Sequence, residues 1–109
     1  MHEFIPGQRW ISDTELQMGL GTVLSVDART VTVLFLATEE VRTYSRQTAP
    51  LSRAAFAPGD RVHSHEGWSL DVESVIERDG LLTYHGRRED GDAAQLPEGE
   101  LDNLMQLNR

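Results

Sequence analysis

Short runs of alternating apolar and polar residues dominate this chain of 109 residues. A period of two is typical of strands with one buried face, and the β-branched run at residues 30–36 is the clearest case. Gly19 and Gly21 favour a strong bend or a bulge where the preceding run begins. In the first half, the pattern predicts strands at residues 8–12, 20–26, 30–36 and 41–44, and a closing strand that begins at Pro50-Leu51.

The second half has the same kind of pattern, with Asp79-Gly80 as a hairpin turn. Strict alternation would place Val72 and Val75 on opposite faces, so we expect a bulge near Glu73-Ser74. The predicted strands are residues 61–65, 68–77, 81–86, 95–96 and 103–107, with a solvated loop over 87–94. A short C-terminal helix is the alternative to the last strand, because three leucines also fit a helical spacing: Leu101, Leu104 and Leu107.

A repeated motif organises these strands. Pro6-Gly7-Gln8-Arg9 returns 52 residues later as Pro58-Gly59-Asp60-Arg61, and two alternating runs follow each copy. Because repetition marks the unit of folding, the sequence predicts an all-β protein of two tandem five-stranded small barrels, residues 1–55 and 56–109. Units of this size have thin cores, so we expect them to pack against each other. The side chains predicted to be mostly buried are Val23, Val31, Val33, Phe35, Val72, Val75, Leu82 and Tyr84.

The charge of the chain is unevenly distributed. The formal net charge is −8, of which residues 1–55 carry −1 (five Arg, six Asp or Glu) and residues 56–109 carry −7 (five Arg, twelve Asp or Glu). A surface this acidic repels phosphate, so direct binding of nucleic acid by the second unit is disfavoured. It suits a basic protein partner, and simple solubility is the alternative explanation.

Two residue types are missing from the sequence. Without lysine the chain cannot form a GxxxxGK[ST] phosphate loop, and without cysteine it has no disulfide, thiolate metal site or cysteine nucleophile. No apolar run approaches the roughly 18 residues of a membrane span, and no signal peptide opens the chain. We therefore expect a cytoplasmic protein without a cofactor.

His63 and His65 share one face of a predicted strand and form a possible metal-binding pair, with a third ligand from Glu66, Asp71 or His85. A polar strand face near a turn is the favoured explanation. Carboxylates are also numerous, but general acid–base catalysis needs a carboxyl group held in a cleft, and a barrel this small offers none of substrate size. No serine lies in a nucleophile-elbow context. We therefore predict neither a metal site nor an active site, and a chain that is not an enzyme.

Trp10 and Trp68 each lie near the start of a predicted unit. Their repeated position favours a role in core or inter-barrel packing. The alternative is an exposed aromatic groove that grips a peptide or a nucleic-acid strand, in which Arg42, Arg46 and Arg53 form a basic rim.

Several runs of this sequence together resemble the N-terminal region of the RapA family. Members of that family are bacterial Swi/Snf-type ATPases that associate with RNA polymerase and recycle it. The resemblance covers nearly all of this chain but only a small leading part of such an ATPase, and the ATPase lobes are absent. The runs that carry it are residues 7–15, 19–23 and 26–32, Pro58-Gly59-Asp60, Gly67-Trp68 and residues 80–84.

The resemblance implies two tandem Tudor-like or KOW-like barrels of the SH3-like class. It also implies contact with RNA polymerase and restraint of the ATPase lobes of the same protein. Acidic residues of the second unit offer a basic partner a point of attachment, chiefly Glu89, Asp90 and Asp92. A small-barrel module that binds nucleic acid is the alternative function.

Overall fold

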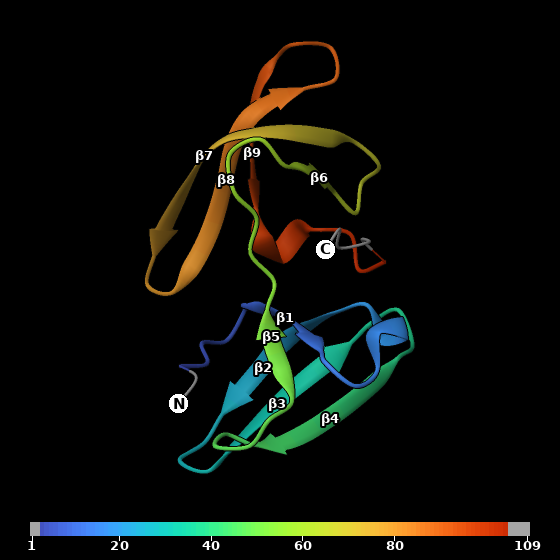
Figure 1. The fold of residues 1–109 in the computed structure, drawn as a ribbon, viewed down its shortest axis with the longest axis vertical. Helices are drawn as coiled ribbons and strands as arrows, with labels where there is room; N and C mark the ends of the chain where they lie inside the picture. The colour runs from blue at the N-terminus through green and yellow to red at the C-terminus, as the bar shows by residue number, and fades with distance from the viewer. Residues whose placement is uncertain (1–2, 105–109) are drawn as a thin grey trace.

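The computed structural model describes residues 3–104, which form two antiparallel β-sheets arranged one after the other along the long axis (Figure 1). The first sheet is curled and has the strand order β4-β3-β2-β1-β5, with a short 3-10 helix, η1, between β1 and β2. Its elements are β1 (Arg9–Ser12), η1 (Leu16–Met18), β2 (Leu20–Val26), β3 (Thr30–Phe35), β4 (Glu40–Ser45) and β5 (Leu51–Arg53).

The second sheet has the strand order β6-β7-β8-β9 and is followed by a second 3-10 helix, η2. A single bridge between Ser64 and Leu101 extends its β6 side. The described residues are thus nearly all β, which confirms the predicted all-β class, but the second sheet has four strands where five were predicted. The elements are β6 (Arg61–His63), β7 (Ser69–Arg78), β8 (Leu81–Arg88), β9 (Ala93–Pro97) and η2 (Glu98–Glu100).

The sequence repeat has a counterpart in the backbone of the two sheets. Gly7 and Gly59, at φ +97° and +98°, adopt a conformation that only glycine reaches without strain. Each donates its N–H to a strand carbonyl at 2.9 Å, Gly7 to Val23 and Gly59 to Val72. In both sheets a bulge follows that acceptor immediately, at Val23/Ser25 and at Val72/Ser74. The repeated Pro-Gly turn therefore anchors the same bulged strand in each half.

Three local predictions differ from the structure. The sequence predicts a strong bend or a bulge at Gly19 and Gly21, and the bulge in β2 instead follows Val23. Gly21 is in regular register, and a Cβ there would lie 2.5 Å from Val33. The loop expected over 87–94 is a tight turn, because β8 continues to Arg88 and β9 begins at Ala93. Of the last predicted strand, residues 103 and 104 form a turn, and 105–109, including Leu107, lie outside the described residues.

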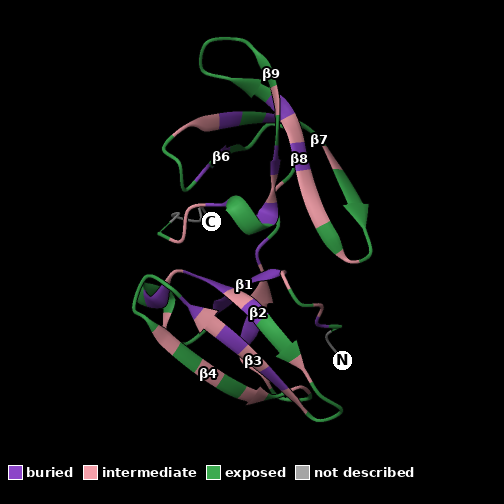
Figure 2. Cartoon of the chain, turned by 180° about the vertical axis from the view of Figure 1, so that it is seen from behind, coloured by how far each residue is buried: buried purple, intermediate pink, exposed green. Residues whose placement is uncertain are grey.

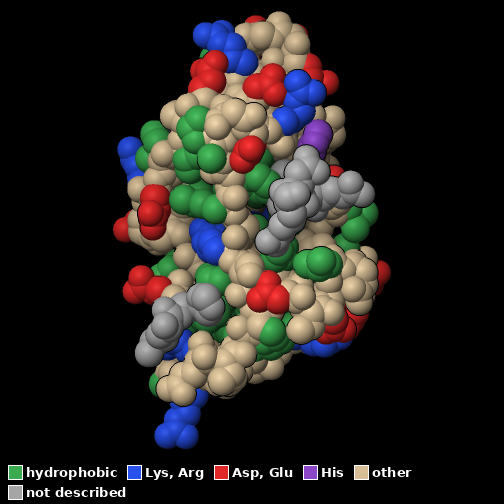
Figure 3. All heavy atoms as spheres, viewed as in Figure 1, with side chains coloured by type: hydrophobic (Ala, Val, Ile, Leu, Met, Phe, Trp, Pro, Cys, Tyr) green, Lys and Arg blue, Asp and Glu red, His purple; other side chains and the backbone are tan. Residues whose placement is uncertain are grey.

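The two sheets share part of one hydrophobic core. Trp10 packs into the interior of the first sheet, whereas its neighbour Ile11 packs with Leu70 and Tyr84 of the second. All four residues of β1 are buried, so this strand is covered on both of its faces (Figure 2). Leu20 at the start of β2 also belongs to the core of the second sheet. Hydrophobic side chains gather where the two sheets meet on the face shown in Figure 3.

The predicted core residues are mostly buried, with two exceptions. Six are at most 3% exposed, whereas Val75 and Leu82 are only half-buried against the core of the second sheet. Both lie where the β7–β8 hairpin extends past its neighbours, since β6 pairs only with residues 69–71 of β7. Near the tip, β7 and β8 therefore pair with each other but not with β6 or β9, because β9 pairs only with residues 83–87 of β8. The six buried residues are Val23, Val31, Val33, Phe35, Val72 and Tyr84.

Truncation of a core valine should destabilise the protein, whereas truncation of an exposed valine should not. We expect Val33→Ala and Val72→Ala each to lower the free energy of unfolding by about 1–3 kcal/mol, since both side chains are at most 3% exposed. Val41→Ala is the matched control, because Val41 on β4 is 58% exposed. Urea unfolding of the three variants provides the measurement, and equal stabilities would contradict the strand phases described above.

Candidate interaction surfaces and the junction between the sheets

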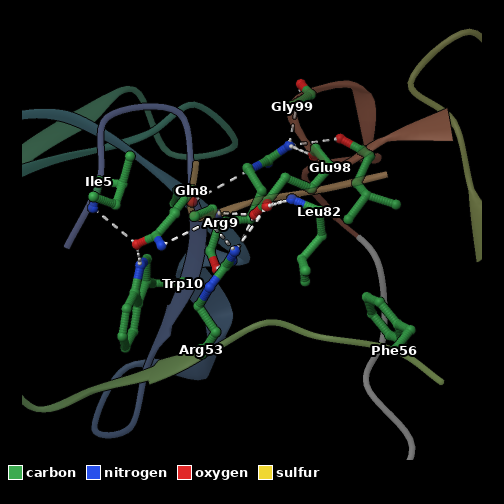
Figure 4. A network of polar contacts seen from close by, with 12 residues as sticks. Ile5, Gln8, Arg9, Trp10, Arg53, Phe56, Leu82, Glu98 and Gly99 are labelled. Atoms are coloured by element: carbon green, nitrogen blue, oxygen red, sulfur yellow. Dashed lines mark hydrogen bonds and ion pairs between the residues drawn. The ribbon is translucent and has the colours of Figure 1, made fainter. Parts of the chain in front are cut away.

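The junction between the sheets is built around the carboxylate of Glu98, at the start of η2, which is 2% exposed (Figure 4). Arg53 of β5 donates to both of its oxygens, at 2.5 and 2.7 Å. The backbone N–H of Arg9 donates to Oε1 at 2.8 Å, and that of Leu82 donates to Oε2 at 2.5 Å. One buried carboxylate thus accepts four hydrogen bonds that come from β1, β5 and β8.

Arg9 crosses the junction in the opposite direction. Its side chain is 1% exposed, and its guanidinium donates to the carbonyls of Gly21 at 3.2 Å and Leu101 at 3.0 Å. It also donates to the side-chain amide oxygen of Asn103. Burial lowers the pKa of Arg9, an effect that the nearby carboxylates of Glu98 and Asp102 oppose. An arginine remains charged under these conditions, so acceptors from β2 and from the segment that follows β9 together hold a fixed cation of the first sheet.

The tip of the β7–β8 hairpin adds a third attachment. Gln8 donates through Nε2 to the carbonyl of Gly80 at 2.9 Å, and Arg53 donates to the same carbonyl at 3.3 Å. The side-chain oxygen of Gln8 accepts from the Trp10 indole and from the Ile5 N–H, both at 3.0 Å (Figure 4). With the shared core and the Glu98 contacts, these bonds fix how the two sheets are oriented.

Two of the residues predicted to bind a partner lie in or beside this junction. The Trp10 ring is 3% exposed and packs on Phe4, with a distance of 4.6 Å between ring centroids. Arg53 holds Glu98, and its Cζ lies 5.9 Å from the centroid of the Trp10 ring. The packing role favoured for Trp10 from the sequence therefore agrees with its burial.

The three arginines of the expected basic rim do not come together. Arg53 lies on β5 and Arg42 on β4, at opposite ends of the strand order. Arg42 pairs with Glu40 at 2.5 Å and with Glu15 at 3.1 Å, and these contacts raise its pKa. Arg46 follows β4 and donates to the backbone of the β2–β3 turn. Each arginine therefore has a separate local role, and they do not line one groove.

Trp68, which immediately precedes β7, is already in contact with a cationic side chain of its own sheet, that of Arg88. The ring is half-buried against the second core, and the guanidinium carbon of Arg88 lies 4.6 Å from its centroid. This is within the range of a cation–π contact. An incoming ligand would have to displace Arg88 to reach this face of the ring.

The acidic residues predicted as a partner-binding point occupy the β8–β9 turn, at the top of Figure 1. Glu89 is exposed and accepts from the Ser69 N–H at 2.9 Å. Asp90 accepts from the Asp92 N–H at 3.0 Å, and both side chains are exposed. The turn therefore presents three carboxylates to solvent, far from the first sheet (Figure 1).

The histidine pair forms no metal centre with the side chains around it. His63 Nδ1 lies 2.8 Å from the Ser69 hydroxyl, and His65 occupies the turn after β6. Within residues 3–104, no group of three histidine, aspartate or glutamate side chains is placed to hold a metal ion. In the same range, no helix is long and apolar enough to cross a membrane.

Sequence reasoning missed the two residues on which the junction depends, Arg9 and Glu98. Arg9 was visible only as one letter of the repeated motif, and its counterpart Arg61 is exposed and pairs with Asp71 at 2.8 Å. Glu98 was one of twelve acidic residues in the second half. The sequence signal was the position of Arg9 directly before the apolar pair Trp10-Ile11, and the structure buries this strand on both faces.

Removal of the Glu98 carboxylate should destabilise the whole chain. Glu98→Ala leaves the Arg53 guanidinium and the N–H groups of Arg9 and Leu82 without their buried acceptor, and such a loss costs about 3–5 kcal/mol. Glu100→Ala is the matched control, because Glu100 lies in the same 3-10 helix and is exposed. Thermal unfolding followed by circular dichroism provides the measurement. Equal midpoints for the two variants would show that the junction is not needed for stability.

Comparison with protein families gives two adjacent matches. The model of the RapA N-terminal Tudor-like domain 1 matches residues 4–54, and that of the RapA N-terminal Tudor-like domain matches residues 56–109. Two Tudor-like domains therefore follow one another in this chain, as the resemblance implied. The division at residues 55 and 56 stays a prediction for the folded protein.

Curated relatives support the same assignment. The chain is 55% identical to the RNA polymerase-associated protein RapA of Proteus mirabilis over 107 residues and to that of Vibrio atlanticus over 108 residues. It is 49% identical to that of Stutzerimonas stutzeri over 105 residues. These alignments cover 96–97% of the chain but only 11% of each relative. The chain therefore belongs to the RapA family, as its N-terminal Tudor-like region.

Proposed function

We propose that this chain is a non-catalytic interaction and regulatory module of an RNA polymerase-recycling ATPase. In this role it contacts RNA polymerase and restrains the ATPase lobes of its parent protein in the cytoplasm. The observation that carries the proposal is the match of two RapA Tudor-like domains to nearly the whole chain. The relatives' names associate those proteins with RNA polymerase.

The geometry of the junction supports a role in presenting surfaces. Four hydrogen bonds to Glu98 and a shared core hold the two sheets in one orientation. A module whose parts do not move relative to each other loses little conformational entropy on binding, which favours affinity. Such a module can transmit contact on one sheet as a change in the position of the other.

Charge favours a basic surface as the partner of the second sheet. Three carboxylates are exposed on one turn and take no part in the salt bridges of the sheet, which involve Asp71 and Glu73. They are those of Glu89, Asp90 and Asp92. The lobes and the polymerase would compete for the module, each favouring a different placement of it. A switch of this kind works only through differential affinity for the two placements.

Deletion of the module tests the restraint. We expect an otherwise intact RapA-type ATPase that lacks residues 1–109 to hydrolyse ATP faster than the full protein when polymerase is absent, because the restraint is gone. Steady-state ATP turnover is the measurement. Basal turnover that is unchanged or lower after deletion would refute restraint, while a pull-down of polymerase by the isolated module tests contact separately.

Neutralisation of the acidic turn tests the electrostatic part of the proposal. We expect the full protein with Glu89→Gln, Asp90→Asn and Asp92→Asn to show raised basal turnover, with the largest effect at low salt, because exposed charges are screened as salt increases. The matched control changes the same amount of charge on the β7–β8 hairpin, as Glu73→Gln, Glu77→Gln and Asp79→Asn. Equal effects of the two triple variants would exclude a special role for the turn.

A further inference from the structure

A pocket of about 400 Å³ lies at the end of the first sheet that is remote from the second. It is formed between the β2–β3 turn and the segment that follows β4, which lie at the bottom of Figure 1. Of the interactions described above, the hydrogen bond from Arg46 to the β2–β3 turn lies here. The residues that line the pocket are Ala28, Arg29, Ser45, Arg46 and Gln47.

Arg46 is held rigidly in the wall of this pocket. Its Nη1 donates to the carbonyl of Asp27 at 2.9 Å and lies 3.5 Å from that of Ala28. Its backbone N–H donates to the Arg29 carbonyl at 2.9 Å. Its Nε is buried and has no hydrogen-bond partner within the described residues. The guanidinium is therefore pre-oriented by the backbone, and no carboxylate there neutralises it by a direct contact.

Arg29 supplies a second cation at the same pocket. It is exposed on the β2–β3 turn, so its side chain is free to reach a ligand there. The opposing charge is Asp27, whose carboxylate accepts from the Thr30 hydroxyl at 3.4 Å. Two guanidinium groups against one carboxylate leave a local excess of positive charge. Ser45 and Gln47 add a hydroxyl and an amide that can hydrogen-bond a polar ligand.

We propose that this pocket binds a phosphate that is linked to a sugar, as in a nucleotide or in the backbone of single-stranded RNA. Guanidinium groups are the usual protein partners of phosphate. The volume exceeds that of a bare phosphate and is in the range of sites for small organic ligands. Among the described residues that line the pocket there is no aromatic ring, so recognition falls on the sugar and phosphate and not on base stacking.

The strong negative charge of the second half does not prevent this binding. The acidic β8–β9 turn lies at the other end of a molecule that is 44 Å long (Figure 1). At physiological ionic strength the Debye length is about 8 Å, so charges at the two ends are screened from each other. In Figure 3 a basic side chain protrudes at the lower end of the molecule, and basic side chains also lie at the upper end. This proposal is independent of the contact with polymerase and of the restraint of the lobes.

Nuclear magnetic resonance of the ¹⁵N-labelled chain tests the site directly. The probes are inorganic phosphate, ribose 5-phosphate and an oligomer of eight uridines. We expect ribose 5-phosphate and the oligomer to shift the Arg46 Nε–H and Gln47 amide signals, with little effect from inorganic phosphate. No shift at these groups with either sugar phosphate overturns the proposal. Equal shifts with inorganic phosphate mean an adventitious ion only and also overturn it.

The salt dependence of oligomer binding gives a second readout. Two phosphate contacts to a single strand predict a slope of about −1.4 in log K against log salt, so a change from 50 to 200 mM weakens binding about sevenfold. Arg29→Gln should halve that slope, so the same change in salt should weaken oligomer binding only about two- to threefold. Arg46 is left unchanged because its guanidinium holds the turn.

Arg61→Gln is the matched control, because Arg61 is an exposed arginine of the second sheet. It should leave both the slope and the shifts unchanged. If Arg29→Gln and Arg61→Gln weaken binding equally, the interaction is a general effect of charge and the proposed site is wrong. If the oligomer binds no more tightly than ribose 5-phosphate, the site takes a free nucleotide; tighter binding of the oligomer identifies the RNA backbone.

Discussion

The carboxylate of Glu98 is the constraint on which the arrangement of this molecule depends. Two backbone N–H groups and a bidentate guanidinium donate to it in a position that is almost closed to water. A buried ion pair adds little net stability, because desolvation offsets the attraction. Its effect is therefore on orientation: a displacement of the second sheet would leave the carboxylate and the Arg9 guanidinium buried and unpaired. The polar junction therefore makes one relative orientation of the sheets lower in free energy than slightly displaced arrangements.

The same constraint explains why β1, which pairs with β2 on one side and β5 on the other, is buried on both of its faces. Trp10 and Ile11 point to opposite faces, and each face is covered by a different core. A sheet of this size buries little apolar surface alone, so the shared core supplies part of the stabilisation of both halves. Hydrophobic burial favours contact between the sheets but does not specify their relative orientation. The hydrogen bonds to Glu98 specify that orientation.

Local features were predictable from the sequence because they depend on neighbouring residues. Alternation located most of the strands, and the change of phase between Val72 and Val75 located the bulge at Val72/Ser74. The junction was not predictable, because it joins Arg9 to residues about 90 positions away and no periodic pattern marks such a pair. The repeat was misleading at this point: it equates Arg9 with Arg61, yet one is buried and the other exposed. Of the candidate site, the composition of the acidic turn was predictable, and the separation of Arg42, Arg46 and Arg53 was not.

A fixed junction changes what the uneven charge of this chain can do. If the sheets moved freely, the acidic turn and the arginine pocket would act as two unrelated surfaces joined by a linker. Because the sheets are held in one orientation, a basic partner at the acidic end also determines where the pocket at the opposite end is directed. The separation of the two surfaces then becomes a property of the fold. If both proposed contacts form, a partner that engages both surfaces would need basic and phosphate-bearing parts that match that spacing.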